Sequence, residues 1–208
     1  MPQAIMESIP HWISALAESV TALSIILVLL QLKESHTQRK EDHDRSRREA
    51  AVECCHIWTK SLDRESSSAR KLVEQFTHLQ CENLEKGDRL LVDGTYLALV
   101  SSCFPERDTQ LNPNGQIDLS PSETTHLRYM MVRYINTLES ILATWRHNVA
   151  DREIIREEFG YLFDPKKGHH LLKEFRAVLG DDNYPAIRDF EADLKSNPLR
   201  VGKPQLGQ

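Results

Sequence analysis

The residue types that bind anions gather in one short segment of the chain. Residues 164–170 read Asp-Pro-Lys-Lys-Gly-His-His, and Asp-Pro is a typical helix start, where free backbone amides attract anions. Two arginines that precede this segment are expected nearby, provided that the last three helices pack as neighbours. The candidate anion-binding residues are Lys166, Lys167, His169, His170, Arg146 and Arg152. Their chemistry suits a phosphate-bearing ligand or an acidic partner.

Acidic residues are interleaved with these basic ones, which leaves a second interpretation open. They are Asp151, Glu153, Glu157, Glu158 and Asp164. A helix surface on which both signs alternate is usually solvated. The cluster is therefore either an anion site or an ordinary surface of mixed charge.

Other pairs of reactive side chains in the chain match no common catalytic pattern. His169 and His170 are adjacent, as are Cys54 and Cys55, and adjacent side chains on a helix point about 100° apart, so they do not face one metal ion. The sequence contains no GxxxxGK[ST], GxGxxG, HExxH, CxxC or GxSxG motif. We predict no catalytic residue, no metal site and no cofactor, and rank enzymatic activity third among the functions considered.

Glu18 is an ionisable residue at the edge of a long apolar stretch. The uncharged residues 19–32 read SVTALSIILVLLQL. An acid inside a membrane span needs a partner or a wet cavity, and Ala15, Glu18, Ser19 and Ala22 share one helix face. A homo-oligomer would gather Glu18 side chains around a pore. Alternatively, Glu18 lies at the outer interface and reaches water, or the membrane helix starts after it.

The element that would position Glu18 is a predicted membrane helix over residues 10–32. At ~1.5 Å per residue these residues cover ~34 Å, enough for the ~30 Å hydrocarbon layer, whereas residues 19–32 alone cover only ~21 Å. The Leu, Ile and Val side chains between Trp12 and Leu32 favour insertion by about 3 to 7 kcal/mol, and a central acid opposes it by about 2.5 to 3.5 kcal/mol. The balance predicts one span. A cleaved signal peptide and a buried core helix are the alternatives.

Basic residues follow the predicted span and none precedes it. They are Lys33, Arg39, Lys40, Arg45, Arg47 and Arg48. The positive-inside rule places residues 1–9 outside and residues 33–208 in the cytoplasm, where the cysteines are reduced. Residues 33–49 contain no apolar side chain but carry acid–base pairs such as Glu41–Arg45 at i,i+4. They are predicted to form a charged stalk helix that continues the membrane helix.

Residues 50–196 are predicted to form one all-helical cytoplasmic domain of about six helices. The strongest helix start is Ser120-Pro121-Ser122-Glu123, with an N-cap, Pro at N1 and Glu at N3. Its apolar stripe comprises Leu127, Met130, Met131, Tyr134, Leu138, Ile141, Leu142 and Trp145. A helix weakened by Gly94 is expected over residues 88–102, a long loop over 104–119 and a helix from Asp164-Pro165 to Leu179-Gly180. No strand is expected, and residues 197–208 form a disordered tail.

Composition excludes several classes of protein. The 208 residues include 26 Lys and Arg against 31 Asp and Glu, for a net charge of −5, which argues against a nucleic-acid-coating protein. A hydrophobic fraction of 40% with 27% charged residues is typical of a globular chain. Four cysteines are too few for a disulfide scaffold.

Several segments together resemble a loose group of uncharacterised bacterial single-pass membrane proteins. They are Leu23–Lys33 (LSIILVLLQLK), the charged stalk, Trp58 with Leu62, and Ser140–Phe159 (SILATWRHNVADREIIREEF). The resemblance covers residues 12–195. It implies a bacterial inner-membrane protein with one N-terminal membrane helix, a charged stalk and a helical cytoplasmic domain, and it brings no catalytic residue.

Two functions from different classes follow from these features. The first is a membrane-anchored, non-enzymatic helical module that binds a partner or self-associates at the cytoplasmic face of the membrane. The second is an oligomeric membrane-acting effector, of the antiphage-defence type, triggered through its cytoplasmic domain. The expected partners are membrane lipid, further copies of the chain and an unidentified cytoplasmic protein, rather than nucleic acid.

Overall fold

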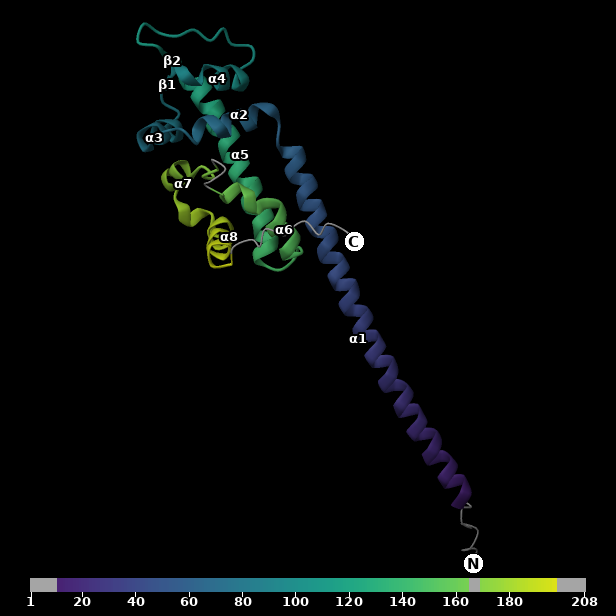
Figure 1. Cartoon of the computed structure of the whole chain (residues 1–208). Helices are drawn as coiled ribbons and strands as arrows, with labels where there is room; N and C mark the ends of the chain where they lie inside the picture. The colour runs from purple at the N-terminus through teal and green to yellow at the C-terminus, as the bar shows by residue number, and fades with distance from the viewer. Residues whose placement is uncertain (1–10, 165–168, 198–208) are drawn as a thin grey trace, which may run out of the picture. The chain divides into compact units, whose positions relative to one another are not determined.

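The computed structural model describes residues 11–164 and 169–197, apart from the side chains of residues 11–18 and Ala22. Eight α-helices, three short 3-10 turns and one two-stranded sheet form the regular structure of this part (Figure 1). The chain divides into two compact units, Met1–Ser46 and Arg47–Gln208. The mainly helical structure confirms the all-α prediction.

The first unit is formed by the N-terminal part of helix α1 (His11–Ser61). The backbone is helical from His11 through the apolar residues and on through residues 33–46. Ser24 Oγ donates a hydrogen bond to the Val20 carbonyl oxygen at 2.8 Å, so this polar side chain is satisfied within its own helix. Among the residues that the structure describes, no helix is long and apolar enough to cross a membrane.

Helix α5 (Pro121–Arg146) is the longest helix that lies wholly in the second unit (Figure 1). It begins with the predicted capping box: Ser120 Oγ accepts from the Glu123 amide, and Glu123 Oε2 accepts from the Ser120 amide at 2.8 Å. All eight residues of its predicted apolar stripe are buried. The sequence therefore predicted both the start and the buried face of this helix.

The remaining elements of the second unit pack around α5. Helices α2 (Arg64–Val73), α3 (His78–Lys86), α6 (Arg152–Phe159) and α8 (Pro185–Ser196) contact α5, while α4 (Leu97–Cys103) packs on α2 and α7 (Lys173–Leu179) packs on α3. The end of α1 also enters this core, where the Trp58 ring lies 5.0 Å from Tyr134 and 5.6 Å from Phe159 between ring centres. The described part of residues 50–196 thus contains the end of α1 and the seven helices α2–α8, against about six helices predicted.

A two-stranded antiparallel sheet replaces part of the helix and loop predicted for residues 88–119. Strand β1 (Leu90–Asp93) pairs with β2 (Gln116–Leu119), with Leu90 opposite Leu119 and Val92 opposite Ile117. These four apolar side chains point inward, but four residues of alternation are too short to identify from the sequence. A Cβ at Gly94 would overlap the Gly115 carbonyl oxygen, so this glycine permits a close backbone approach and does not weaken a helix.

The helix predicted to start at Asp164-Pro165 begins later, at Lys173. Residues 165–168 lie outside the described part of the chain, and residues 169–172 are not α-helical. Leu171 and Leu172 adopt positive φ angles of 44° and 53°, although a left-handed conformation disfavours a residue with a Cβ. Both side chains are buried, so burial of two leucines holds this turn in place.

Candidate functional site

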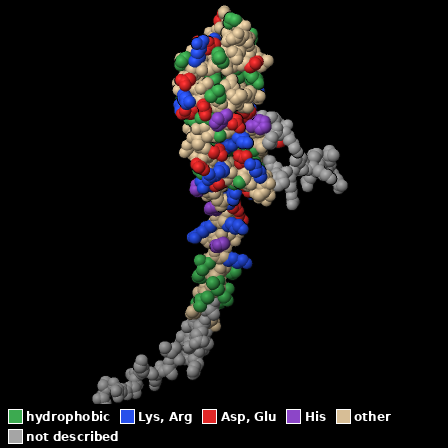
Figure 2. Space-filling view, turned by 90° about the vertical axis from the view of Figure 1, so that its left-hand side faces the viewer, with side chains coloured by type: hydrophobic (Ala, Val, Ile, Leu, Met, Phe, Trp, Pro, Cys, Tyr) green, Lys and Arg blue, Asp and Glu red, His purple; other side chains and the backbone are tan. Residues whose placement is uncertain are grey.

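The first candidate feature is the apolar segment, residues 19–32 of α1. Nine large hydrophobic side chains of this segment are between 52% and 61% exposed: Val20, Leu23, Ile25, Ile26, Leu27, Val28, Leu29, Leu30 and Leu32. Figure 2 shows them as a green band, followed along the helix by Lys and Arg side chains. Exposed apolar surface of this extent is typical of a surface that another apolar medium covers.

Glu18, the predicted membrane-embedded acid, belongs to the helical backbone of α1. Its side chain lies outside the described residues, as does Pro10, the first residue of the predicted span. The proposed gathering of Glu18 side chains in an oligomer therefore stays a prediction.

The second candidate feature is a hollow in the second unit, which we call the basic pocket. It has a volume of about 300 Å³ and is lined by Phe163, His169, His170, Leu171, Lys173, Arg176, Glu191 and Lys195. The lining comes from the residues before α7, from α7 itself and from α8. Three basic side chains face one acidic side chain, so the lining carries a net charge of +2 when both histidines are neutral.

Arg176 is the buried cation of the basic pocket. Its side chain is only 4% exposed, with Nη2 3.4 Å from Glu191 Oε2 and Nη1 3.4 Å from Asp181 Oδ1. Its Nε is buried and makes no hydrogen bond to any described residue. A buried guanidinium with long contacts and an unused donor is costly unless a further acceptor reaches it.

Glu191 joins two cations of the basic pocket. Its Oε1 accepts from Lys195 Nζ at 2.8 Å, and its Oε2 lies 3.4 Å from Arg176 Nη2. Burial raises the pKa of Glu191, but Lys195 and Arg176 together outweigh burial and hold the pKa below its ordinary value. Glu191 therefore stays ionised and organises both cations.

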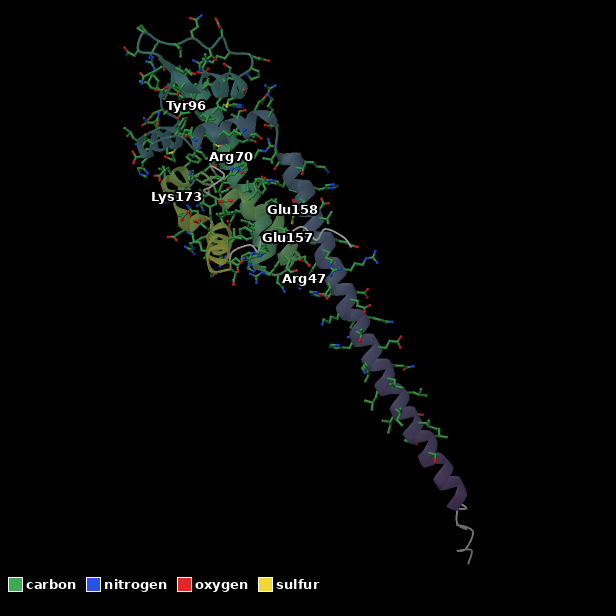
Figure 3. The ribbon with its side chains drawn as sticks, in the orientation of Figure 1. Arg47, Arg70, Tyr96, Glu157, Glu158 and Lys173 are labelled. Atoms are coloured by element: carbon green, nitrogen blue, oxygen red, sulfur yellow. The ribbon has the colours of Figure 1, made fainter. Side chains whose placement is uncertain are left out.

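A second buried ion pair contacts His169, just before the turn at Leu171 and Leu172. Arg70 on α2 is buried, and its Nη1 donates to Glu74 Oε2 at 2.6 Å and to His169 Nδ1 at 3.2 Å. An arginine can only donate, so His169 Nδ1 is the acceptor and the proton of a neutral ring sits on Nε2. Figure 3 labels Arg70 and, at the start of α7, Lys173. His169 thus connects α2 to the lining of the basic pocket.

Another hollow shares part of its lining with the basic pocket. Its volume is about 280 Å³, and it is lined by Val73, Glu74, His170, Leu172, Lys173 and Glu174. Glu74 has a side chain that is 3% exposed, and its Oε1 has no hydrogen-bond partner among the described residues. His170 and Lys173 line both hollows, so the strained turn at Leu171 and Leu172 lies where the two meet.

No family model, curated protein or solved structure matches this chain. The apolar segment and the basic pocket are therefore the two features on which a functional proposal rests. Among the described residues, no three His, Cys, Asp or Glu side chains gather in a way that would hold a metal ion.

The structure places four of the six predicted anion-binding residues. His169 and His170 line the basic pocket, whereas Lys166 and Lys167 lie outside the described residues. Arg146 Nε is 2.7 Å from Asp189 Oδ2, and the Arg152 guanidinium stacks 4.2 Å above the centre of the Trp145 ring. Neither arginine lines the pocket.

Sequence reasoning missed the cations that do line the pocket. Lys173 and Arg176 are three residues apart, a spacing that places them on one face of a helix, and this was the available signal. Lys195 joins them only because the fold brings α8 to the same pocket as α7. No spacing rule connects it with residues so far away in the sequence.

Proposed function

We propose that the chain is a membrane-anchored helical interaction module. Residues 10–32 hold it in the bacterial inner membrane, and its C-terminal unit binds a partner or self-associates at the cytoplasmic face. One observation carries this proposal: nine large apolar side chains of the apolar segment are each more than half exposed.

The exposed side chains of the apolar segment lie on all sides of the helix. Residues 25–30 are six successive large hydrophobics, and at about 100° per residue they leave no polar face. A helix of this kind is stable where an apolar medium surrounds it, as lipid does, and a groove on a protein would cover only one side. The nine side chains favour transfer into a bilayer by roughly 3 to 5 kcal/mol.

The residues that follow support the orientation. Residues 33–46 of α1 are helical and include Lys33, Arg39, Lys40 and Arg45. Basic residues next to a span are retained in the cytoplasm. The second unit follows them in the chain, so the proposal places it in the cytoplasm.

An interaction role is preferred to catalysis on two grounds. The sequence has none of the common catalytic motifs, and α5 presents Tyr129, which is 63% exposed. Tyr129 and Val132 border a shallow hollow of about 370 Å³ with Arg133, Asn136, Thr137 and Ser140. An exposed tyrosine beside a hollow is typical of surfaces that bind proteins.

Membrane fractionation of the full chain tests the proposal. We expect the protein in the carbonate-resistant membrane fraction, with a defined mass in detergent and a fluorescent C-terminal GFP fusion. The double variant L27R/L29R should move to the soluble fraction. Its matched control is V52R/I57R, which changes two exposed apolar residues of the same helix outside the apolar segment.

Two outcomes of this experiment would contradict the membrane anchor. Wild-type protein in the soluble fraction, or release of both double variants alike, would overturn the membrane anchor. If the protein is anchored, its mass in detergent distinguishes self-association from binding of another protein, and Tyr129→Ala should weaken whichever complex forms.

A further inference from the structure

We infer that the basic pocket binds a small metabolite that carries a phosphate monoester. This inference is independent of the membrane anchor, because it concerns residues of the second unit only. It rests on the charge of the pocket, on the unused hydrogen-bonding capacity of its cations and on its size.

The charge of the pocket matches a phosphate monoester. Lys173, Arg176 and Lys195 oppose Glu191, which leaves a net charge of +2. A phosphate monoester carries close to two negative charges at neutral pH, whereas a carboxylate carries one. A dianion would therefore neutralise the lining residues, while Asp181, which pairs with Arg176 from outside the lining, lowers the charge of the surroundings by one.

Its cations also have donors to spare. Arg176 is buried, yet its Nε has no hydrogen-bond partner among the described residues, and its two ion-pair contacts are both long at 3.4 Å. Lys173 makes no ion pair with any described residue, and Lys195 Nζ uses one of its three protons on Glu191. A tetrahedral phosphate with three acceptor oxygens can accept from donors on both α7 and α8.

The size and shape of the pocket restrict the rest of the ligand. About 300 Å³ is at the lower end of the range for small-molecule sites, so a monophosphate fits and a long polyphosphate chain does not. Phe163 supplies an apolar wall, and its ring is held 5.3 Å from the Phe190 ring between centres. A sugar or a base attached to the phosphate would pack on this wall.

The turn that carries His170 and Leu171 supports a binding role as well. Leu171 and Leu172 hold positive φ angles, and each such residue costs roughly 1 to 2 kcal/mol of backbone strain. The strain is tolerated because both side chains are buried. The result is a pocket wall whose backbone is fixed before any ligand arrives.

Calorimetry on the full chain in detergent tests the inference with three probes at constant ionic strength: inorganic phosphate, AMP and adenosine. We expect AMP to bind more tightly than inorganic phosphate, and adenosine not to bind. Lys173→Gln and Lys195→Gln should each raise the Kd for AMP about tenfold, because each removes one charge-assisted contact. Lys86→Gln, an exposed lysine of α3, is the matched control and should change nothing.

Lysine acetylation read by mass spectrometry locates the site without any substitution. AMP should protect Lys173 and Lys195 and leave Lys86 fully reactive. If inorganic phosphate binds as tightly as AMP, the pocket recognises the free ion alone, and the inference of a phosphorylated metabolite is overturned. No saturable binding, or an equal loss in all three variants, would overturn the pocket itself.

Discussion

The two units of the chain place their side chains in opposite ways. In the apolar segment of the first unit, nine large hydrophobic side chains are exposed. In the second unit, three charged side chains, Arg70, Glu74 and Arg176, are almost completely buried. An exposed apolar surface is stabilised by a partner outside the chain, whereas a buried charge is stabilised by partners inside it. The first unit is thus suited to an apolar environment, and the second to specific contacts between charged groups.

Breaking the Arg70–Glu74 pair should have the largest effect on the second unit. Glu74→Leu leaves Arg70 buried without its closest acceptor, so we expect a loss of about 3 to 5 kcal/mol in the free energy of unfolding. Urea denaturation measures it. Asp182→Asn, which removes the exposed partner of Arg188, is the control and should lose less than about 1 kcal/mol. A loss for Glu74→Leu as small as the control's would mean that Arg70 finds other partners.

A leucine-to-alanine substitution should have the next largest effect in the second unit and almost none in the first. Leu138→Ala removes a side chain with no exposed surface, and should lower the free energy of unfolding by about 2 to 5 kcal/mol. Leu27→Ala should leave unfolding of the second unit unchanged within about 0.5 kcal/mol. Chemical denaturation in detergent compares the two variants. Equal losses would show that Leu27 is packed as a core residue.

The thiols of the second unit should report its burial through their reactivity. Burial raises the pKa of Cys81 to about 11 and that of Cys103 to about 12. At pH 8 roughly one Cys81 side chain in a thousand, or fewer for Cys103, is then a thiolate, so both should react slowly with DTNB. Cys55 is half-buried and should react before them, and urea should make all four react. Fast labelling of Cys81 or Cys103 in the folded chain would contradict their burial.

The smallest expected effect concerns pH and Glu191. Because its folded pKa lies below the ordinary value of 4.5, ionised Glu191 contributes stability above pH 4.5. That stability is lost as pH falls below 4.5 through the folded pKa. The difference in the free energy of unfolding between wild type and Glu191→Gln, measured by urea denaturation, should shrink over this window. Its size should stay under about 1 kcal/mol because the group is partly exposed. A difference that grows on acidification would reverse the sign of the shift.

Features formed by neighbouring residues in the sequence were predicted well. The Ser120 capping box and the buried stripe of α5 depend on residues three or four apart, and both are present. The β1–β2 sheet was missed because each strand has only four residues and the paired residues are 23 to 29 positions apart in the sequence. The wall of the basic pocket was missed because left-handed leucines are rare, and only tertiary burial makes Leu171 and Leu172 adopt that conformation.

Tertiary packing also explains why Arg146 and Arg152 do not line the basic pocket. The sequence placed Arg146 and Arg152 near His169 and His170 on the assumption that the last three helices are neighbours. Packing of α8 against α5 instead gives Arg146 the acceptor Asp189. Arg152 gains the Trp145 ring, and α8 brings Lys195 to the pocket in their place.

The two hollows share part of one wall. His170 and Lys173 belong to both linings, so a molecule that draws Lys173 into one hollow removes its charge from the other. Were both hollows to bind ligands, the affinity of each would depend on the occupancy of the other, and by reciprocity the coupling energy would be the same in both directions. The ammonium group of Lys173 can thus serve only one of the two cavities at a time.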